Sequence, residues 1–222
     1  MVAVIGGTGD EGFGLALRWA KAGMEVVIGS RDAGRASAAA DRLTEQVPDA
    51  RVSGATNQDA VASSDLVVVT VPFAGQAEIY ASIGDHVGED AVVVDCTVPV
   101  AAAVGAKVTH TLGVWEGSAA QQGASYLARG TMCAAFHSLP AAVLNDLNQE
   151  LEGDVLVCGS KKSARERVKG LVEAIPKLRY VDAGPLENAR MVEPITVLLI
   201  GLNRRYKTHG TGIRITGLPD RP

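Results

Sequence analysis

Residues 2–14 read VAVIGGTGDEGFG, an apolar run that leads directly into a glycine-rich turn. The first four of these residues predict a buried strand, and residues 15–22 predict a helix that Gly23 ends. Between them, residues 7–12 form a GxGxxG pattern. This pattern between a strand and a helix is typical of dinucleotide-binding domains, because the helix N-terminus binds the pyrophosphate. The stretch therefore predicts a Rossmann-type fold.

Each glycine of this pattern has a separate expected role. Gly7 permits the tight turn, Gly9 lets the backbone approach the pyrophosphate, and Gly12 lets the helix pack against the strand. Two acids in the first helical turn interact favourably with the helix dipole, so they need not face the phosphates. The candidate cofactor-binding residues of the loop are Gly7, Thr8, Gly9, Asp10, Glu11 and Gly12.

Strand-like and helix-like segments alternate along the rest of the chain. Further strands are predicted over residues 25–29, 51–54, 65–71, 91–95, 131–136, 154–157 and 179–182. Helices are predicted over residues 33–46, 118–127, 163–174 and 186–206, where Pro194 either kinks the last helix or marks its start. The alternation predicts an α/β fold with a doubly wound parallel sheet over residues 1–183, followed by a small, mainly helical domain over residues 184–222.

The end of the second predicted strand indicates which dinucleotide binds. Domains that prefer NAD carry an acid there, whereas this chain has Gly29 and Ser30, followed by Arg31 and, one helical turn later, Arg35. A hydroxyl group beside guanidinium groups suits a ribose 2′-phosphate. We therefore expect NADP.

Two later strand ends also belong to the expected site. Val71 and Pro72 follow the fourth predicted strand, and Val98 and Pro99 follow the fifth. Ligands of doubly wound sheets bind at the carboxyl ends of the strands, although each proline could simply end its strand.

Composition excludes several other classes of protein. A formal net charge of -4 argues against nucleic-acid and anionic-membrane partners, and no apolar run is long enough to span a bilayer. The opening segment is unlike a signal peptide, so a cytoplasmic location is expected. Neither the 3 cysteines nor the 4 histidines have metal-ligand spacing, so we expect no metal.

The chain resembles the NADPH-dependent reductases of coenzyme F420, an 8-hydroxy-5-deazaflavin. The resemblance runs almost end to end, and its most distinctive motifs are AFHSLPA (135–141), DVLVCG (154–159) and DAGPLENARMVEPIT (182–196). It implies hydride transfer between NADP(H) and F420, with the C-terminal domain closing a deazaflavin cleft. It also implies that the adenosine half of NADP contacts Thr8, Ser30, Arg31 and Arg35, and that the deazaflavin contacts Val98, Pro99, His137, Leu139 and Thr196.

Direct transfer between two rings needs no catalytic side chain, and the sequence contains no evident catalytic constellation. His137 is the one histidine in a site-like motif, where it is either a hydrogen-bond donor to a ligand or a packed core residue. Two alternatives remain open: an NADPH-dependent reductase of a flavin, pterin or imine, and a non-catalytic NADP-binding subunit. Apolar residues 186–202 favour a homodimer interface.

Overall fold

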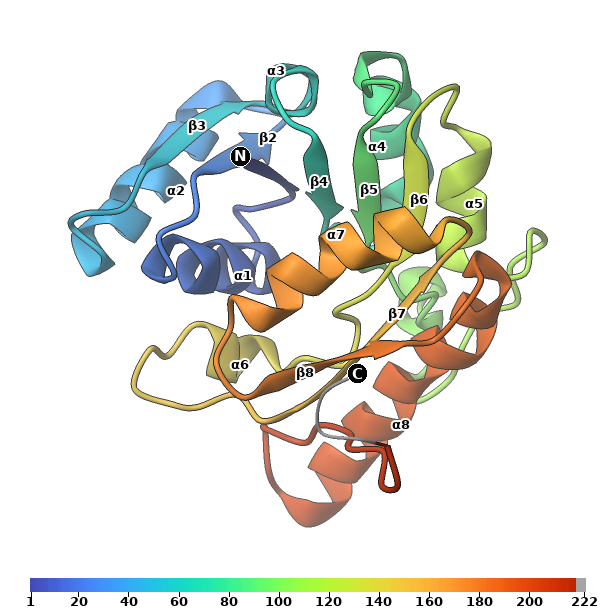
Figure 1. The fold of residues 1–222 in the computed structure, drawn as a ribbon. Helices are drawn as coiled ribbons and strands as arrows, with labels where there is room; N and C mark the ends of the chain where they lie inside the picture. The colour runs from blue at the N-terminus through green and yellow to red at the C-terminus, as the bar shows by residue number, and fades with distance from the viewer. Residues whose placement is uncertain (219–222) are drawn as a thin grey trace.

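A computed structural model describes residues 1–218, in which eight strands form one sheet of order β3-β2-β1-β4-β5-β6-β7-β8 (Figure 1). The strands are β1 (Val2–Ile5), β2 (Val26–Ser30), β3 (Val52–Thr56), β4 (Leu66–Val69), β5 (Val92–Asp95), β6 (Thr131–Ala134), β7 (Gly153–Gly159) and β8 (Leu178–Asp182). The first six strands in this order are parallel to one another. The predicted α/β class is confirmed.

Helices cover both faces of the sheet. They are α1 (Asp10–Lys21), α2 (Ala33–Gln46), α3 (Asn57–Ala62), α4 (Phe73–Ile83), α5 (Ala119–Ser125), α6 (Ala141–Leu144), α7 (Lys162–Glu173) and α8 (Ala189–Tyr206). Short 3-10 turns lie at Gly84–His86, Ala101–Val104 and Leu186–Asn188. None of the helices described is both long and apolar enough to cross a membrane.

Alternation along the strands divides the interior into two cores, because successive side chains point to opposite faces of a sheet. Val2 and Val4 belong to the core under α1, α2 and α7, whereas Ala3 and Ile5 belong to the core under α3, α4 and α5. Burial on both faces explains why the central strands are almost entirely apolar.

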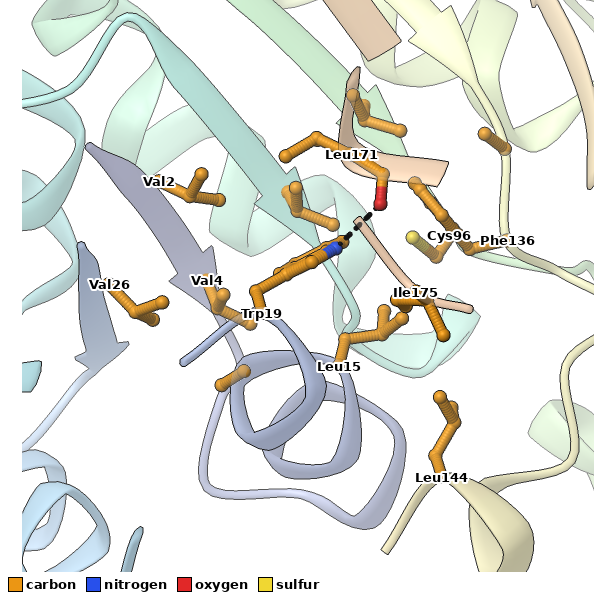
Figure 2. Close-up of a cluster of buried hydrophobic side chains, with 14 of the residues drawn as sticks. Val2, Val4, Leu15, Trp19, Val26, Cys96, Phe136, Leu144, Leu171 and Ile175 are labelled. Carbon is orange, nitrogen blue, oxygen red and sulfur yellow. Dashed lines mark hydrogen bonds between the residues drawn. The ribbon is translucent and has the colours of Figure 1, made fainter. Parts of the chain in front are cut away.

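Trp19 of α1 is the largest buried side chain of the first core (Figure 2). Its Nε1 donates a hydrogen bond to the Leu171 carbonyl at 2.9 Å, which joins α1 to α7 on the same face of the sheet. Its ring meets Phe136 edge-on, with centroids 5.6 Å apart. Since Phe136 follows β6, this contact ties α1 to the segment that begins beyond β6.

The sheet is parallel as predicted except where β7 pairs with β6. This strand is antiparallel to β6, and the two pair only through Cys133 with Gly159 and Ala134 with Cys158. Most of β7, together with its parallel neighbour β8, therefore extends beyond the carboxyl edge of the parallel strands (Figure 1). The physical reason is the connection over residues 135–152, whose only helix is the short α6, too short to carry the chain back across the sheet as a parallel crossover requires.

Two predictions about helices also need correction. Helix α1 begins at Asp10 rather than at residue 15, so the acids and Gly12 lie within the helix. Pro194 does not mark the start of α8, which begins at Ala189 and includes the proline. The proposed division into two domains at residue 183 stays a prediction.

Candidate functional site

The carboxyl ends of the parallel strands meet where the strand order reverses between β1 and β4, the usual ligand position in doubly wound sheets. Two cavities open there, and both are lined by Gly9, Thr70, Val71 and Pro72. We refer to them as the first and the second cavity. Because they share these four residues, one extended ligand can occupy both.

The first cavity has a volume of about 270 Å³. The other residues that line it are Gly6, Thr8, Ser30, Arg31, Asp32, Arg35, Asn57, Gly75, Glu78 and Ile79. Ser30, Arg31 and Arg35 therefore come together at the end of β2, as the sequence predicted. Asp32 caps α2, because its Oδ1 accepts a hydrogen bond from the Arg35 backbone N–H at 2.8 Å. Arg31 and Arg35 are the cations in the lining of this cavity, which also includes the carboxylates of Asp32 and Glu78.

The glycine loop lies between the cavities, and the structure corrects one of its expected roles. The left-handed residue of the turn is Gly6, with φ of 83°, and not Gly7. Gly7 is required because a Cβ there would lie 2.9 Å from the Val4 carbonyl oxygen. A Cβ on Gly12 would lie 2.4 Å from Thr70 Oγ1 and 2.8 Å from the Gly6 carbonyl oxygen. The lack of a side chain at these positions lets α1 pack closely against the strands, as the sequence predicted for Gly12.

Gly9 differs from these three glycines. A Cβ built on it would approach only the Gly6 carbonyl oxygen, at 3.4 Å, and its backbone is extended with φ of −86°. Protein packing therefore does not require a glycine at this position. The open space in front of Gly9 faces both cavities, so a ligand accounts for this glycine better than the fold does.

The second cavity has a volume of about 380 Å³. Its remaining lining consists of Asp10, Glu11, Phe73, Cys96, Thr97, Val98, Val100, His137, Ala141 and Thr196. These residues come from α1, from the ends of β4, β5 and β6, and from α8. The cavity thus joins the glycine loop to distant segments, as the motifs AFHSLPA and MVEPIT predicted.

His137 is a buried residue whose Nε2 has no hydrogen-bond partner among the described residues. Burial lowers the pKa of His137 to about 4, so its imidazole is neutral near pH 7. The hydroxyl of Thr196 donates a hydrogen bond to the His137 carbonyl at 2.8 Å. The preceding residue, Phe136, has a left-handed φ of 68°, which is rare for a bulky side chain. A strained backbone and an unpaired nitrogen favour a ligand-binding role over that of a packed core histidine.

The segment that follows His137 is fixed to α1. Arg18 is 9% exposed, and its guanidinium donates hydrogen bonds to four carbonyls of this segment, those of Val143, Leu144, Asp146 and Gln149. Asn145 Nδ2 in turn donates to the Asp10 carbonyl at 2.7 Å. The wall of the second cavity is therefore connected to the helix that begins at the glycine loop. A lone arginine in an apolar helix gave no signal of this role.

Three carboxyl groups lie beside or beneath the second cavity. Asp95 and Glu193 are buried, whereas Glu11 is half-buried with its Oε1 enclosed. Asp95, at the end of β5, accepts hydrogen bonds from Gln76 Nε2 at 2.8 Å, from the Tyr80 hydroxyl at 2.7 Å and from the Thr97 backbone at 2.7 Å. Burial nevertheless raises the pKa of Asp95 to about 6. Burial, with a smaller effect of the Asp95 charge, raises the pKa of Glu11 to about 8.

The third carboxyl group, Glu193, links α8 to α5. Its two oxygens accept hydrogen bonds from the backbone N–H groups of Ala119 and Ala120, at 2.9 and 3.0 Å. Burial raises the pKa of Glu193 to about 7. Because Thr196 is one helical turn away on α8, this link helps to hold Thr196 at the cavity.

Four predicted site residues lie outside the lining of both cavities: Gly7 and Gly12, which are packed within the glycine loop, and Pro99 and Leu139. Leu139 lines a separate cavity of about 170 Å³ between the segment after β6 and residues 210–213. Pro99 lies between two residues of the lining, Val98 and Val100, and its carbonyl accepts a hydrogen bond from Leu112 N–H at 2.7 Å. Their contacts with a ligand stay predictions.

The sequence analysis missed several residues of the lining. Thr70, Cys96 and Thr97 directly follow strands, so their position at strand ends could have indicated them. Asn57 likewise follows the edge strand β3, but it carries no motif, and the strand was predicted to end at residue 54. Among residues 1–218, no group of three or more His, Cys, Asp or Glu side chains is placed to hold a metal ion.

Comparison with known proteins gives consistent findings. Residues 1–99 match the family model described as NADP oxidoreductase, coenzyme F420-dependent. The F420-dependent NADP reductase of Methanothermobacter thermautotrophicus is 47% identical over 223 residues, covering 99% of this chain and 96% of its own. The enzyme of the same name from Methanocaldococcus jannaschii is 39% identical over 221 residues, covering 98% of each chain.

A solved structure agrees in fold. A provisionally named F420-dependent NADP reductase from Arthrobacter sp. fb24 superimposes with a TM-score of 0.80 at 23% identity, covering 97% of this chain and 98% of its own. At this level of identity the likeness concerns the fold.

Proposed function

Since the chain belongs to the family of F420-dependent NADP reductases, we propose that it transfers a hydride between NADP(H) and coenzyme F420 in the two joined cavities. The observation that carries this proposal is the continuity of the cavities across Gly9, Val71 and Pro72. One end of the combined space is lined by arginines and the other by mainly apolar groups around a neutral histidine. NADP has the same polarity, with the 2′-phosphate on its adenosine half, the pyrophosphate in the middle and the nicotinamide ring at the other end.

The residues of the first cavity fit the adenosine half of NADP. Arg31 and Arg35 provide guanidinium groups for a dianionic 2′-phosphate, and Ser30 provides a hydroxyl group. The open space at Gly9 and the unpaired N–H groups at the start of α1 suit the pyrophosphate. The nicotinamide then belongs in the second cavity.

The second cavity fits a nicotinamide and a partner ring. When bound, the two substrates supply the chemistry themselves, because a hydride passes between two ring carbons. The protein positions the two rings and excludes water from between them. His137 offers its unpaired Nε2 for a hydrogen bond to a ring substituent, and Thr196 fixes the backbone of His137. No side chain is assigned a catalytic role.

The test is reduction of F420 by NADPH with purified protein, followed by loss of the deazaflavin absorbance. We expect turnover with F420 and little or none with a flavin, a pterin or an imine. Rapid turnover with one of those acceptors and none with F420 would show that this acceptor, and not F420, is the second substrate. Absence of NADPH oxidation with every acceptor would indicate a non-catalytic NADP-binding subunit.

The absence of a catalytic acid or base is tested at His137. His137→Ala loses one hydrogen bond to a bound ring, so we expect turnover to fall about tenfold, with Thr196→Val as a milder companion. A general acid–base catalyst would cause a loss of roughly 10²–10⁴-fold. A loss of that size in folded His137→Ala, measured by steady-state kinetics with circular dichroism as the control, would contradict the mechanism.

We also propose a homodimer in which α8 contributes to the interface and residues 184–222 close the deazaflavin side of the cleft. Met191 and Leu198 on α8 are 62% and 61% exposed, which supports an apolar contact there. Light scattering after gel filtration would test this, with Leu198→Asp expected to shift the mass to that of a monomer. A cytoplasmic location and the absence of nucleic-acid partners stay predictions.

A further inference from the structure

Glu11 occupies an unusual position for a carboxyl group. It lies in the first turn of α1 and lines the second cavity, yet its Oε1 is buried and has no hydrogen-bond partner among the described residues. Its neighbour Asp10 lines the same cavity but is exposed. A buried carboxylate without donors is unfavourable, so Glu11 either binds a proton or requires a cation beside it.

Asp95 explains why the proton is on Glu11 rather than on Asp95. Three donors, from Gln76, Tyr80 and Thr97, stabilise a negative charge on Asp95. Glu11 has no such donors, and it interacts electrostatically with Asp95. Two neighbouring carboxyl groups whose environments differ in this way take different protonation states, one ionised and one neutral. Burial and Asp95 accordingly raise the pKa of Glu11 to about 8.

The groups around Glu11 include no cation within residues 1–218, the part of the chain that the structure describes. Asp95 and Cys96 come from the end of β5, His137 follows β6, and Asp10 is on the same helix; behind Asp95 are Tyr80 of α4 and Glu193 of α8. His137 is neutral because its pKa is lowered to about 4. A ligand that brings a positive charge into the second cavity would therefore be the nearest cation to Glu11.

The two redox forms of a nicotinamide differ in this charge. The oxidised ring is a cation and the reduced ring is neutral. We propose that Glu11 holds a proton which the protein releases to solvent when NADP⁺ binds and retains when NADPH binds. This inference rests on the proposed function, which places the nicotinamide in the cavity that Glu11 lines. It assigns to Glu11 a role in discriminating the two redox forms of the cofactor.

The test is isothermal titration calorimetry at pH 7.2, with NADP⁺ and NADPH each titrated in phosphate and in Tris buffer. The dependence of the binding enthalpy on buffer ionisation gives the number of protons released. The 2′-phosphate, whose own pKa is about 6, can also release protons, but it is common to both forms. The difference between NADP⁺ and NADPH therefore isolates the nicotinamide end of the site.

We expect wild type to release about half a proton or more per site on binding NADP⁺ beyond what it releases on binding NADPH. The reason is that an opposite charge within ~4–6 Å lowers a carboxyl pKa by ~1–3 units. The ratio Kd(NADP⁺)/Kd(NADPH) should also fall about tenfold or more between pH 6 and 9. Glu11→Gln should abolish both effects. Glu45→Gln, the same change at an exposed acid of α2 that lines neither cavity, should preserve both.

Each other outcome has a distinct meaning. Equal proton release by wild type on binding NADP⁺ and NADPH overturns the inference, and this result does not depend on whether Glu11→Gln folds. In that case the binding of both dinucleotides still supports the proposed function. An excess release that persists in folded Glu11→Gln also overturns it and assigns the proton to another group. Failure of wild type to bind either dinucleotide removes the proposed function and the inference together.

Discussion

The glycine loop permits a paired experiment in which one glycine is required by the ligand and the other by the fold. At Gly9 the backbone is extended, with φ of −86° and ψ of 165°, and the nearest atom to a new Cβ is the Gly6 carbonyl oxygen at 3.4 Å. Valine adopts this conformation readily. As Gly9 is the N-cap of α1, we expect Gly9→Val to destabilise the fold by no more than about 1 kcal/mol.

Binding should respond very differently to the same substitution. The valine side chain would occupy the space in front of the loop that both cavities share, and would displace a pyrophosphate from the start of α1. Loss of two charge-assisted hydrogen bonds, at roughly 1.5–3 kcal/mol each, would weaken NADPH binding by about 10²–10⁴-fold. Calorimetric titration measures this loss, and thermal unfolding followed by circular dichroism measures stability.

Gly12→Ala is the matched control. Its Cβ would lie 2.4 Å from Thr70 Oγ1, 2.8 Å from the Gly6 carbonyl oxygen and 2.9 Å from Gly7 Cα. Two of these atoms are backbone and cannot rotate away, so we expect a destabilisation of about 2–3 kcal/mol and a Tm lower by roughly 4–12 °C. The reasoning would be refuted if folded Gly9→Val bound NADPH within about threefold of wild type. It would also be refuted if Gly9→Val unfolded the chain or Gly12→Ala left the Tm unchanged.

Three further predictions concern specificity, packing and pH. Arg31→Ala should weaken NADP binding about tenfold and leave NAD binding nearly unchanged. Tenfold is the lower end of the range for losing a charge-assisted hydrogen bond, which we expect because Arg31 is exposed. Equal losses of affinity for NADP and NAD in titrations would contradict the assignment of Arg31 to the 2′-phosphate. Arg18→Met leaves four carbonyls without their donor, so we expect the free energy of unfolding to fall by about 3 kcal/mol and the Tm in thermal melts to fall by roughly 6–12 °C. An unchanged Tm would show that other contacts hold the segment after β6. The pKa of Glu11 is raised from 4.5 to about 8, so the folded chain binds more protons than the unfolded chain in this window, and stability falls as the pH rises through it. The lowered pKa of His137 makes stability rise with pH between about pH 4 and 6.5, so the fall in stability should be clearest in urea titrations between pH 6.5 and 8. Glu11→Gln should reduce the slope of stability against pH in that range. An unreduced slope would contradict the protonated state of Glu11.

Local sequence pattern was sufficient for the dinucleotide-binding half of the molecule. The strand, glycine turn and helix of residues 2–21 are formed by neighbours in sequence, and parallel pairing brings Ser30 and Arg31 to the same edge as the turn. The motifs AFHSLPA and MVEPIT also indicated that His137 and Thr196 belong to one site. The predictions of strand, turn and helix succeeded because the periodicity of each element and the topology of a parallel sheet determine them, whereas the binding roles of His137 and Thr196 stay predictions.

Tertiary structure alone decided the rest. The antiparallel direction of β7 follows from the connection over residues 135–152, whose only helix is the short α6 and whose geometry has no periodic signal. The role of Arg18 depends on four carbonyls that are more than 120 residues away in the chain. Glu11 looked from the sequence like an ordinary acid in a first helical turn, and only its burial beside Asp95 changes its protonation. A protonation state depends on solvent exclusion and on the number of nearby donors, and both quantities are set by residues that the chain brings together only when it folds.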